Sequence, residues 1–126
     1  MSKKNIVIYG ATGSIGDSTL NLIRANKDDF NIIGITCNEN VDKLIEIADE
    51  FDCKSIGIAN KELIIRYENQ LRDYTVHAGI DEFYNIVSSN NVDIVIFAIS
   101  GSAPLKLLMQ LANSGKTIGL ANKECI

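Results

Sequence analysis

The sequence predicts an α/β fold: a single domain built on a doubly wound, mostly parallel sheet. Short apolar segments of strand length alternate with longer segments whose apolar residues recur at helical spacing. The first apolar segment runs directly into a turn with three glycines spaced three residues apart. The 126 residues, 46% of them hydrophobic, suffice for one core, and no linker or low-complexity tract divides them.

The predicted strands are apolar and rich in β-branched residues, as parallel strands buried on both faces require. They cover residues 5–9, 30–37, 55–59, a short extra strand at 75–78, 92–99 and 117–121. Because helical segments separate them, the connections cross over the sheet, and right-handed crossovers place helices on both of its faces.

Helices are predicted between these strands from the spacing of apolar residues. They cover residues 14–26, 41–51, 61–71, 81–89 and 102–115. The buried apolar stripe of the first helix is expected to consist of Ile15, Leu20, Leu22 and Ile23. In the last, Ser102 can cap the amino end, and Gly115 ends the helix.

The glycine turn, Gly-Ala-Thr-Gly-Ser-Ile-Gly at residues 10–16, indicates a phosphate-binding site. It has the required context, because a strand precedes it and a helix follows it. Gly10 permits the tight turn, Gly13 lets the backbone approach a ligand, and Gly16 lets the helix lie close to the strand. The first amides of the helix and its dipole can then hold a pyrophosphate. The alternative is a plain strand-to-helix turn that uses glycine only for its geometry.

A dinucleotide is favoured over ATP as the ligand of this turn. A P-loop needs a lysine directly after its last glycine, and no lysine follows Gly16. The hydroxyls of Thr12 and Ser14 can add hydrogen-bond donors for the phosphates. Together with the sheet, these features predict a Rossmann-like dinucleotide-binding domain.

Asn38, Glu39 and Asn40 follow the second predicted strand, where the adenosine ribose is expected. An acid at this place commonly accepts hydrogen bonds from the ribose hydroxyls of NAD, so Glu39 favours NAD. Asn38 and Asn40 can instead donate amide hydrogens to the 2'-phosphate of NADP. The alternative is a solvated loop in which Asn40 caps the next helix.

A second polar cluster, Asn122-Lys123-Glu124, follows the last predicted strand. Lys123 can bind a substrate phosphate or hydroxyl, and Glu124 can orient it by charge pairing. A salt-bridged surface cap is the alternative. Residues 117–124 repeat the pattern of residues 55–62 almost residue for residue, which a similar exit from two strands explains.

The remaining composition limits the class of protein. A net charge of −4 argues against a broad nucleic-acid surface, and no apolar run is long enough for a membrane span or a signal peptide. Cys37, Cys53 and Cys125 form no CxxC pair, which indicates a reduced, cytoplasmic chain. His77 is the only histidine, and the spacing suggests no acid, serine or cysteine with which it could act, so it is interpreted as structural. No metal-ligand spacing occurs among the histidine, the cysteines and the acids.

The glycine turn with its Ser14-Ile15 continuation, taken together with Leu120-Ala121-Asn122-Lys123-Glu124, resembles the 1-deoxy-D-xylulose 5-phosphate reductoisomerase family. Asn40-Val41 and residues 114–118 extend the resemblance over essentially the whole chain. It implies an NADPH-dependent enzyme of non-mevalonate isoprenoid biosynthesis. The enzyme rearranges 1-deoxy-D-xylulose 5-phosphate and reduces the product to 2-C-methyl-D-erythritol 4-phosphate, with Mg²⁺ or Mn²⁺ polarising the substrate.

The resemblance also implies roles for individual residues. The cofactor would be bound by Gly10, Thr12, Gly13, Ser14, Ile15, Asn38, Asn40, Asn122 and Glu124, and the substrate by Lys123. Family members often carry a basic residue where Glu39 stands, because a carboxylate repels a 2'-phosphate. A nearby lysine such as Lys43 can compensate for this charge.

Family members continue for several times this length, and the metal-binding carboxylates, the catalytic flap and the dimerisation region lie in that later part. Residues 1–126 are therefore expected to be the amino-terminal dinucleotide-binding domain of a larger, homodimeric enzyme. We expect this part to hold no catalytic residue and no metal ligand, and to be inactive alone. Another Rossmann-type NAD(P) dehydrogenase, or a non-catalytic nucleotide-binding module, remains as an alternative.

Overall fold

A computed structural model describes residues 3–79, 92–98 and 117–120 of the chain. Strands and helices alternate along its first part, as the apolar pattern predicts. The elements are β1 (Lys4–Tyr9), α1 (Ser14–Ala25), β2 (Phe30–Cys37), α2 (Val41–Glu50), β3 (Ser55–Ile58), α3 (Lys61–Arg66), β4 (Thr75–Ala78), β5 (Ile94–Phe97) and β6 (Thr117–Leu120).

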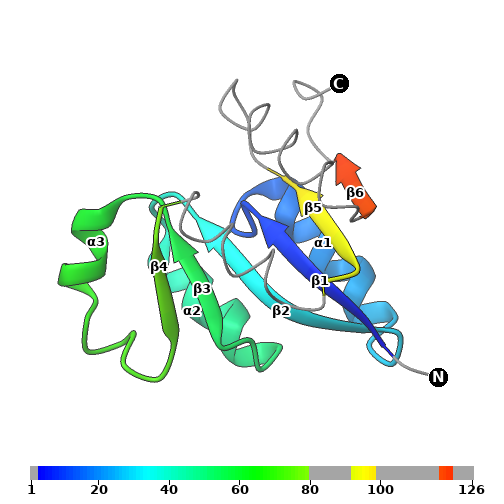
Figure 1. Cartoon of the computed structure of the whole chain (residues 1–126), viewed down its shortest axis with the longest axis horizontal. Coiled ribbons are helices and arrows are strands. Elements are labelled where there is room, and N and C mark those ends of the chain that lie inside the picture. Colours follow the sequence, from blue (N-terminus) through cyan, green and yellow to red (C-terminus); the bar gives the residue numbers. More distant parts are fainter. Residues whose placement is uncertain (1–2, 80–91, 99–116, 121–126) are drawn as a thin grey trace.

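The six strands form one parallel sheet in the order β4-β3-β2-β1-β5-β6. The chain therefore starts in the middle of the sheet and builds outward from β1 to β4 at one edge (Figure 1). It then returns to the other side of β1 and adds β5 and β6. The direction of building reverses between β1 and β5, and ligands of such sheets bind at the carboxyl ends of the strands beside this point. The predicted fold class is confirmed.

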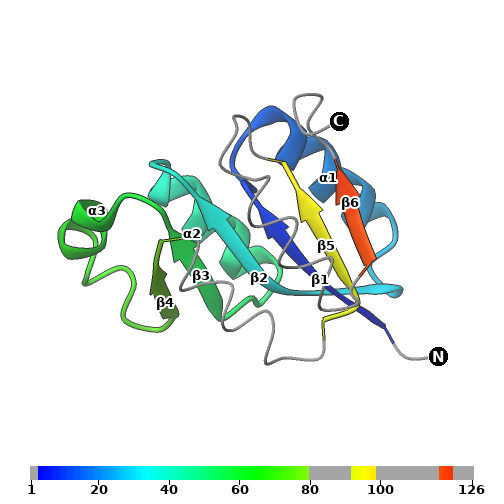
Figure 2. The ribbon, with the colours of Figure 1, turned by 45° about the horizontal axis from the view of Figure 1, so that its top comes forward.

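The helices α1 and α2 lie side by side against one face of the sheet, as Figures 1 and 2 show. Right-handed crossovers from β1 to β2 and from β2 to β3 require this common face. The core lies between these layers, where Ile8 and Ile35 of the strands meet Leu20 and Leu44 of the helices. These four side chains are at most 1% exposed. The helices predicted at residues 81–89 and 102–115 fall outside the described residues.

Two details of the predicted helices are wrong. Leu22 was expected in the buried stripe of α1, but it is 69% exposed, because Leu20 and Ile23 share the inner face and position 22 points outward. The helix α3 ends at Arg66 instead of continuing to Leu71. Leu71 is nevertheless buried, and it reaches the core from a succession of turns, because the polar residues 68–70 provide no apolar stripe to continue the helix.

Candidate functional site

The glycine turn lies at the carboxyl end of β1, beside the point where the strand order reverses. A single residue of β2 holds its backbone in place. The N–H of Gly10 donates to the hydroxyl of Thr36 over 2.9 Å, and the N–H of Ala11 donates to the Thr36 carbonyl over 2.9 Å. Thr36 is buried, so water does not compete for these bonds.

Each of the three glycines in the turn is required or tolerated for a different geometric reason. Gly10 has a φ of 83°, in the left-handed region that only glycine adopts freely. A Cβ at Gly16 would lie 2.3 Å from the Ala11 carbonyl oxygen, so α1 can approach the turn only with glycine there. A Cβ at Gly13 would meet nothing within 4 Å, so the turn is open on that side. The predicted backbone roles of Gly10 and Gly16 are confirmed, and the ligand contact at Gly13 stays a prediction.

The amino end of α1 supplies hydrogen-bond donors on this open side. The helix begins at Ser14 with Gly13 as its N-cap, and its first intrahelical bond runs from the Asp17 N–H to the Gly13 carbonyl over 2.9 Å. The preceding N–H groups, from Ser14 to Gly16, have no acceptor within the helix. They point with the positive end of the helix dipole toward the open space, which suits a phosphate group.

The loop after β2 lies next to this turn and carries Asn38, Glu39 and Asn40, all exposed. The side-chain oxygen of Asn40 accepts a hydrogen bond from the Lys43 N–H over 3.2 Å and so caps α2. The cap anticipated for Asn40 is therefore present. It uses the amide oxygen and not the NH₂ group, so it is compatible with the predicted donation of Asn40 to a ligand.

Lys43 connects the loop after β2 to the glycine turn. Its ammonium lies 3.0 Å from the Thr12 carbonyl oxygen and 2.8 and 2.9 Å from the two carboxylate oxygens of Asp17. The sequence suggests Lys43 only as compensation for Glu39 and gives no sign of its contact with Asp17. The two residues are 26 positions apart, and no local spacing signals a contact between the start of one helix and the start of another.

The second predicted cluster, Asn122, Lys123 and Glu124, falls outside the described residues, as do the side chains of Ser14 and Ile15. The strand before the cluster, β6, pairs in parallel with β5, which pairs in parallel with β1. The carboxyl ends of β1, β5 and β6 therefore lie at the same edge of the sheet.

The first copy of the repeated pattern has a structural role. Asn60 follows β3, and its side-chain oxygen accepts from the Glu62 N–H over 3.2 Å, so it caps α3. The Asn60 N–H also donates to the carbonyl of Asn38 over 3.3 Å, which ties this exit to the loop after β2. These contacts are those of a strand-to-helix exit, as expected for this copy; the exit of the second copy falls outside the described residues.

The two cysteines and the histidine in the described part of the chain are buried. Burial raises the pKa of the Cys37 thiol to about 12 and that of Cys53 to about 11, so both are neutral thiols at neutral pH. His77 lies buried on β4. Within the described ranges, no group of three or more His, Cys, Asp or Glu side chains could hold a metal ion, and no helix is long and apolar enough to cross a membrane.

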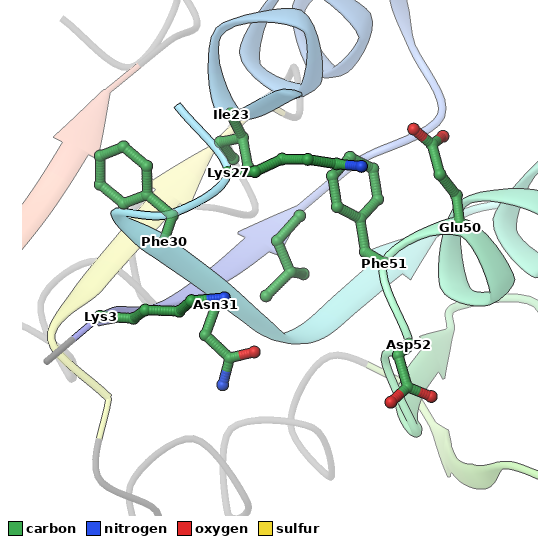
Figure 3. A pocket seen from close by; sticks show the side chains of 9 residues that line it. Lys3, Ile23, Lys27, Phe30, Asn31, Glu50, Phe51 and Asp52 are labelled. Atoms are coloured by element: carbon green, nitrogen blue, oxygen red, sulfur yellow. The ribbon is translucent and has the colours of Figure 1, made fainter. Parts of the chain in front are cut away.

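A hollow of about 190 Å³ lies at the opposite end of the sheet, at the amino ends of β1 and β2. Figure 3 shows Lys3 and Lys27 extending across it beside Phe30 and Phe51. Ligands of doubly wound sheets bind at the carboxyl ends of the strands, so this hollow is not part of the candidate site.

The parallel sheet, the reversal of strand order beside β1 and the glycine turn define a Rossmann-type domain of the class that binds dinucleotides. A family model described as 1-deoxy-D-xylulose 5-phosphate reductoisomerase matches residues 6–126. The chain belongs to the 1-deoxy-D-xylulose 5-phosphate reductoisomerase family, which confirms the resemblance inferred from the sequence.

Relatives that carry this name are similar along almost the whole chain. The chain is 36% identical over 124 residues to the reductoisomerase of Nitrobacter winogradskyi and 38% identical over 126 residues to that of Phocaeicola vulgatus. Both comparisons cover 98% of this chain, but 30% and 33% of those proteins. The chain thus spans about a third of the length of the curated relatives that it matches.

Solved structures show the same arrangement. The Zymomonas mobilis reductoisomerase in complex with NADPH superposes with a TM-score of 0.86 and 35% identity, covering 98% of this chain and 33% of that one. A reductoisomerase in complex with NADPH, fosmidomycin and magnesium superposes with a TM-score of 0.84 and 37% identity, covering 97% of this chain and 31% of that one. The fold of this chain is the fold of the matched region of those proteins.

Replacing Thr36 with valine tests how the turn is held. Valine keeps the shape of threonine but leaves the buried Gly10 N–H without its acceptor, which costs about 1–3 kcal/mol of unfolding free energy. Urea denaturation measures this loss. Thr36→Ser keeps the hydroxyl and should lose less, so a valine variant as stable as the serine variant would show that the hydroxyl does not hold the turn.

Two alanine substitutions separate packing from ligand access. Gly16→Ala places a methyl group against the Ala11 carbonyl oxygen and should lower the unfolding free energy by about 1–3 kcal/mol. The methyl group added by Gly13→Ala meets no atom within 4 Å. This variant should lose less than about 1 kcal/mol of unfolding free energy, which is the difference between glycine and alanine at an N-cap. Thermal melting compares the variants. Equal stabilities would contradict the close approach of α1 at Gly16.

Proposed function

We propose that residues 1–126 form the amino-terminal, NADPH-binding domain of a longer 1-deoxy-D-xylulose 5-phosphate reductoisomerase. The observation that carries this proposal is the glycine turn, which is open at Gly13, together with the first amides of α1, which have no acceptor within the helix. The NADPH complex of the Zymomonas mobilis relative, and the length of the relatives, support it.

In this proposal the backbone of the turn binds the cofactor's pyrophosphate. Gly10 shapes the turn, Thr12 and Gly13 line it, and the amides of Ser14 and Ile15 donate to the phosphate oxygens. Asn38 and Asn40 donate to the 2'-phosphate from the loop after β2. On the other side of β1, Asn122 and Glu124 contact the cofactor, and Lys123 binds the phosphorylated sugar substrate. When bound, NADPH supplies the hydride for the reduction.

The activity of the whole protein belongs to the same proposal. The full-length enzyme rearranges 1-deoxy-D-xylulose 5-phosphate and reduces the product to 2-C-methyl-D-erythritol 4-phosphate. A solved relative holds fosmidomycin and magnesium, which supports a divalent ion, Mg²⁺ or Mn²⁺, bound by residues beyond these 126. The full enzyme is a cytoplasmic homodimer, and residues 1–126 alone bind cofactor without turning over substrate.

Calorimetry of this chain with NADPH, NADP⁺ and NADH tests the cofactor assignment. We expect NADPH and NADP⁺ to bind more tightly than NADH, because only the first two offer a 2'-phosphate to the loop after β2. Gly13→Ala should weaken all three, since its methyl group occupies the open side of the turn. If the folded chain binds none of the three, the assignment is wrong for this domain.

Replacing Glu39 with lysine tests the place of the 2'-phosphate. Glu39 is exposed on the loop after β2, and its carboxylate would repel that phosphate. At low salt we expect NADPH to bind about tenfold more tightly, since unit charges about 4 Å apart interact by about 1 kcal/mol in water. NADH affinity should change little, and Glu39→Gln should lie between. Unchanged or weaker NADPH binding would show that Glu39 is not near the phosphate.

A further inference from the structure

Two ion pairs join α1 to α2, one at each end of the helices. At the amino ends, the Lys43 ammonium pairs with the Asp17 carboxylate at 2.8 Å. At the carboxyl ends, the Arg24 guanidinium donates to both oxygens of Glu50 over 2.5 and 2.7 Å. Both pairs are partly exposed, and such pairs contribute little to stability. The two pairs differ in their position, because only the Lys43–Asp17 pair lies at the glycine turn.

Negative charge near the glycine turn opposes the binding of a phosphate. Asp17 lies in the first turn of α1, the helix whose amino end presents the phosphate-binding amides. An acid there interacts favourably with the helix dipole, but it also repels an anion bound at the same helix end. Glu39, on the loop after β2, adds a second carboxylate at this edge of the sheet. A cation is therefore needed here for a phosphorylated cofactor to bind well.

Lys43 is placed to provide that cation. Its ammonium contacts both oxygens of Asp17 and also the Thr12 carbonyl, within the turn itself. Its backbone N–H is bonded to the side chain of Asn40, the last residue of the loop after β2. One residue is thus anchored at the expected ribose end of the site and reaches the expected pyrophosphate end.

We propose that Lys43 is a positioning residue that sets the affinity of this domain for its phosphorylated cofactor. It neutralises Asp17 beside the bound phosphates and fastens the glycine turn to the start of α2. Its charge also offsets that of Glu39, so that the site accepts the 2'-phosphate and prefers NADPH to NADH. This inference rests on the proposed NADPH-binding function and adds a residue that carries none of the direct contacts proposed above.

Titration of NADPH and NADH at low salt into matched variants of the chain tests the inference. Lys43→Gln exposes the Asp17 carboxylate and should weaken NADPH binding about tenfold, and NADH binding less, because NADH carries fewer charges. Removing the carboxylate as well, in Lys43→Gln with Asp17→Asn, should restore NADPH binding to within about threefold. Lys43→Arg keeps the charge and should also stay within about threefold. Added salt should reduce every difference.

Arg24→Gln is the matched control, because it removes the other ion pair between the same two helices. It should leave NADPH affinity within about twofold of the unaltered chain. The inference is overturned if Lys43→Gln binds NADPH as the unaltered chain does, if the double variant is as weak as Lys43→Gln, or if Arg24→Gln weakens binding equally. A folded chain that binds neither cofactor would instead disprove the proposed function, and this inference with it.

Discussion

The contact between α1 and the glycine turn constrains the rest of the site. At Gly16 the helix lies so close to the Ala11 carbonyl that even a single methyl group would overlap its oxygen. This closeness fixes the amino end of α1 beside the carboxyl end of β1, at the point where the strand order reverses. The amides that suit a phosphate are therefore positioned by backbone packing. Their availability for an anion depends on the absence of a side chain at Gly16.

The same arrangement reconciles the acidic composition of the chain with the anionic cofactor that we propose for it. The net charge is −4, so the molecule as a whole does not attract phosphate. Backbone amides at a helix end bind anions without a charged side chain and do not titrate near neutral pH. The buried Thr36 hydroxyl supports them by bonding the Gly10 N–H, which keeps the turn in one conformation. Local geometry thus outweighs the unfavourable overall charge.

Much of this could be predicted from the sequence, because it depends on local patterns. The strands and helices of the first 79 residues follow apolar periodicity, and the glycines follow from the needs of a tight turn next to a helix. The contacts of Thr36, Asp17 and Lys43 could not be predicted, since they join residues 26 positions apart whose side chains have no motif. The early end of α3 was missed because Leu71 reaches the core without being helical.

The conflicting signals at position 39 show why a single residue is a poor guide to cofactor choice. Considered alone, Glu39 after the second strand favours NAD, whereas the family to which the chain belongs includes a relative solved with NADPH. The quantity that matters is the charge of the whole edge of the sheet, and residues from two helices contribute to it. Lys43 and Asp17 form a pair there, so Glu39 acts together with the charge of a lysine whose backbone N–H is bonded to the same loop. Because Coulomb interactions extend beyond one contact, a basic residue one helical turn after the loop can do the work of a basic residue within it.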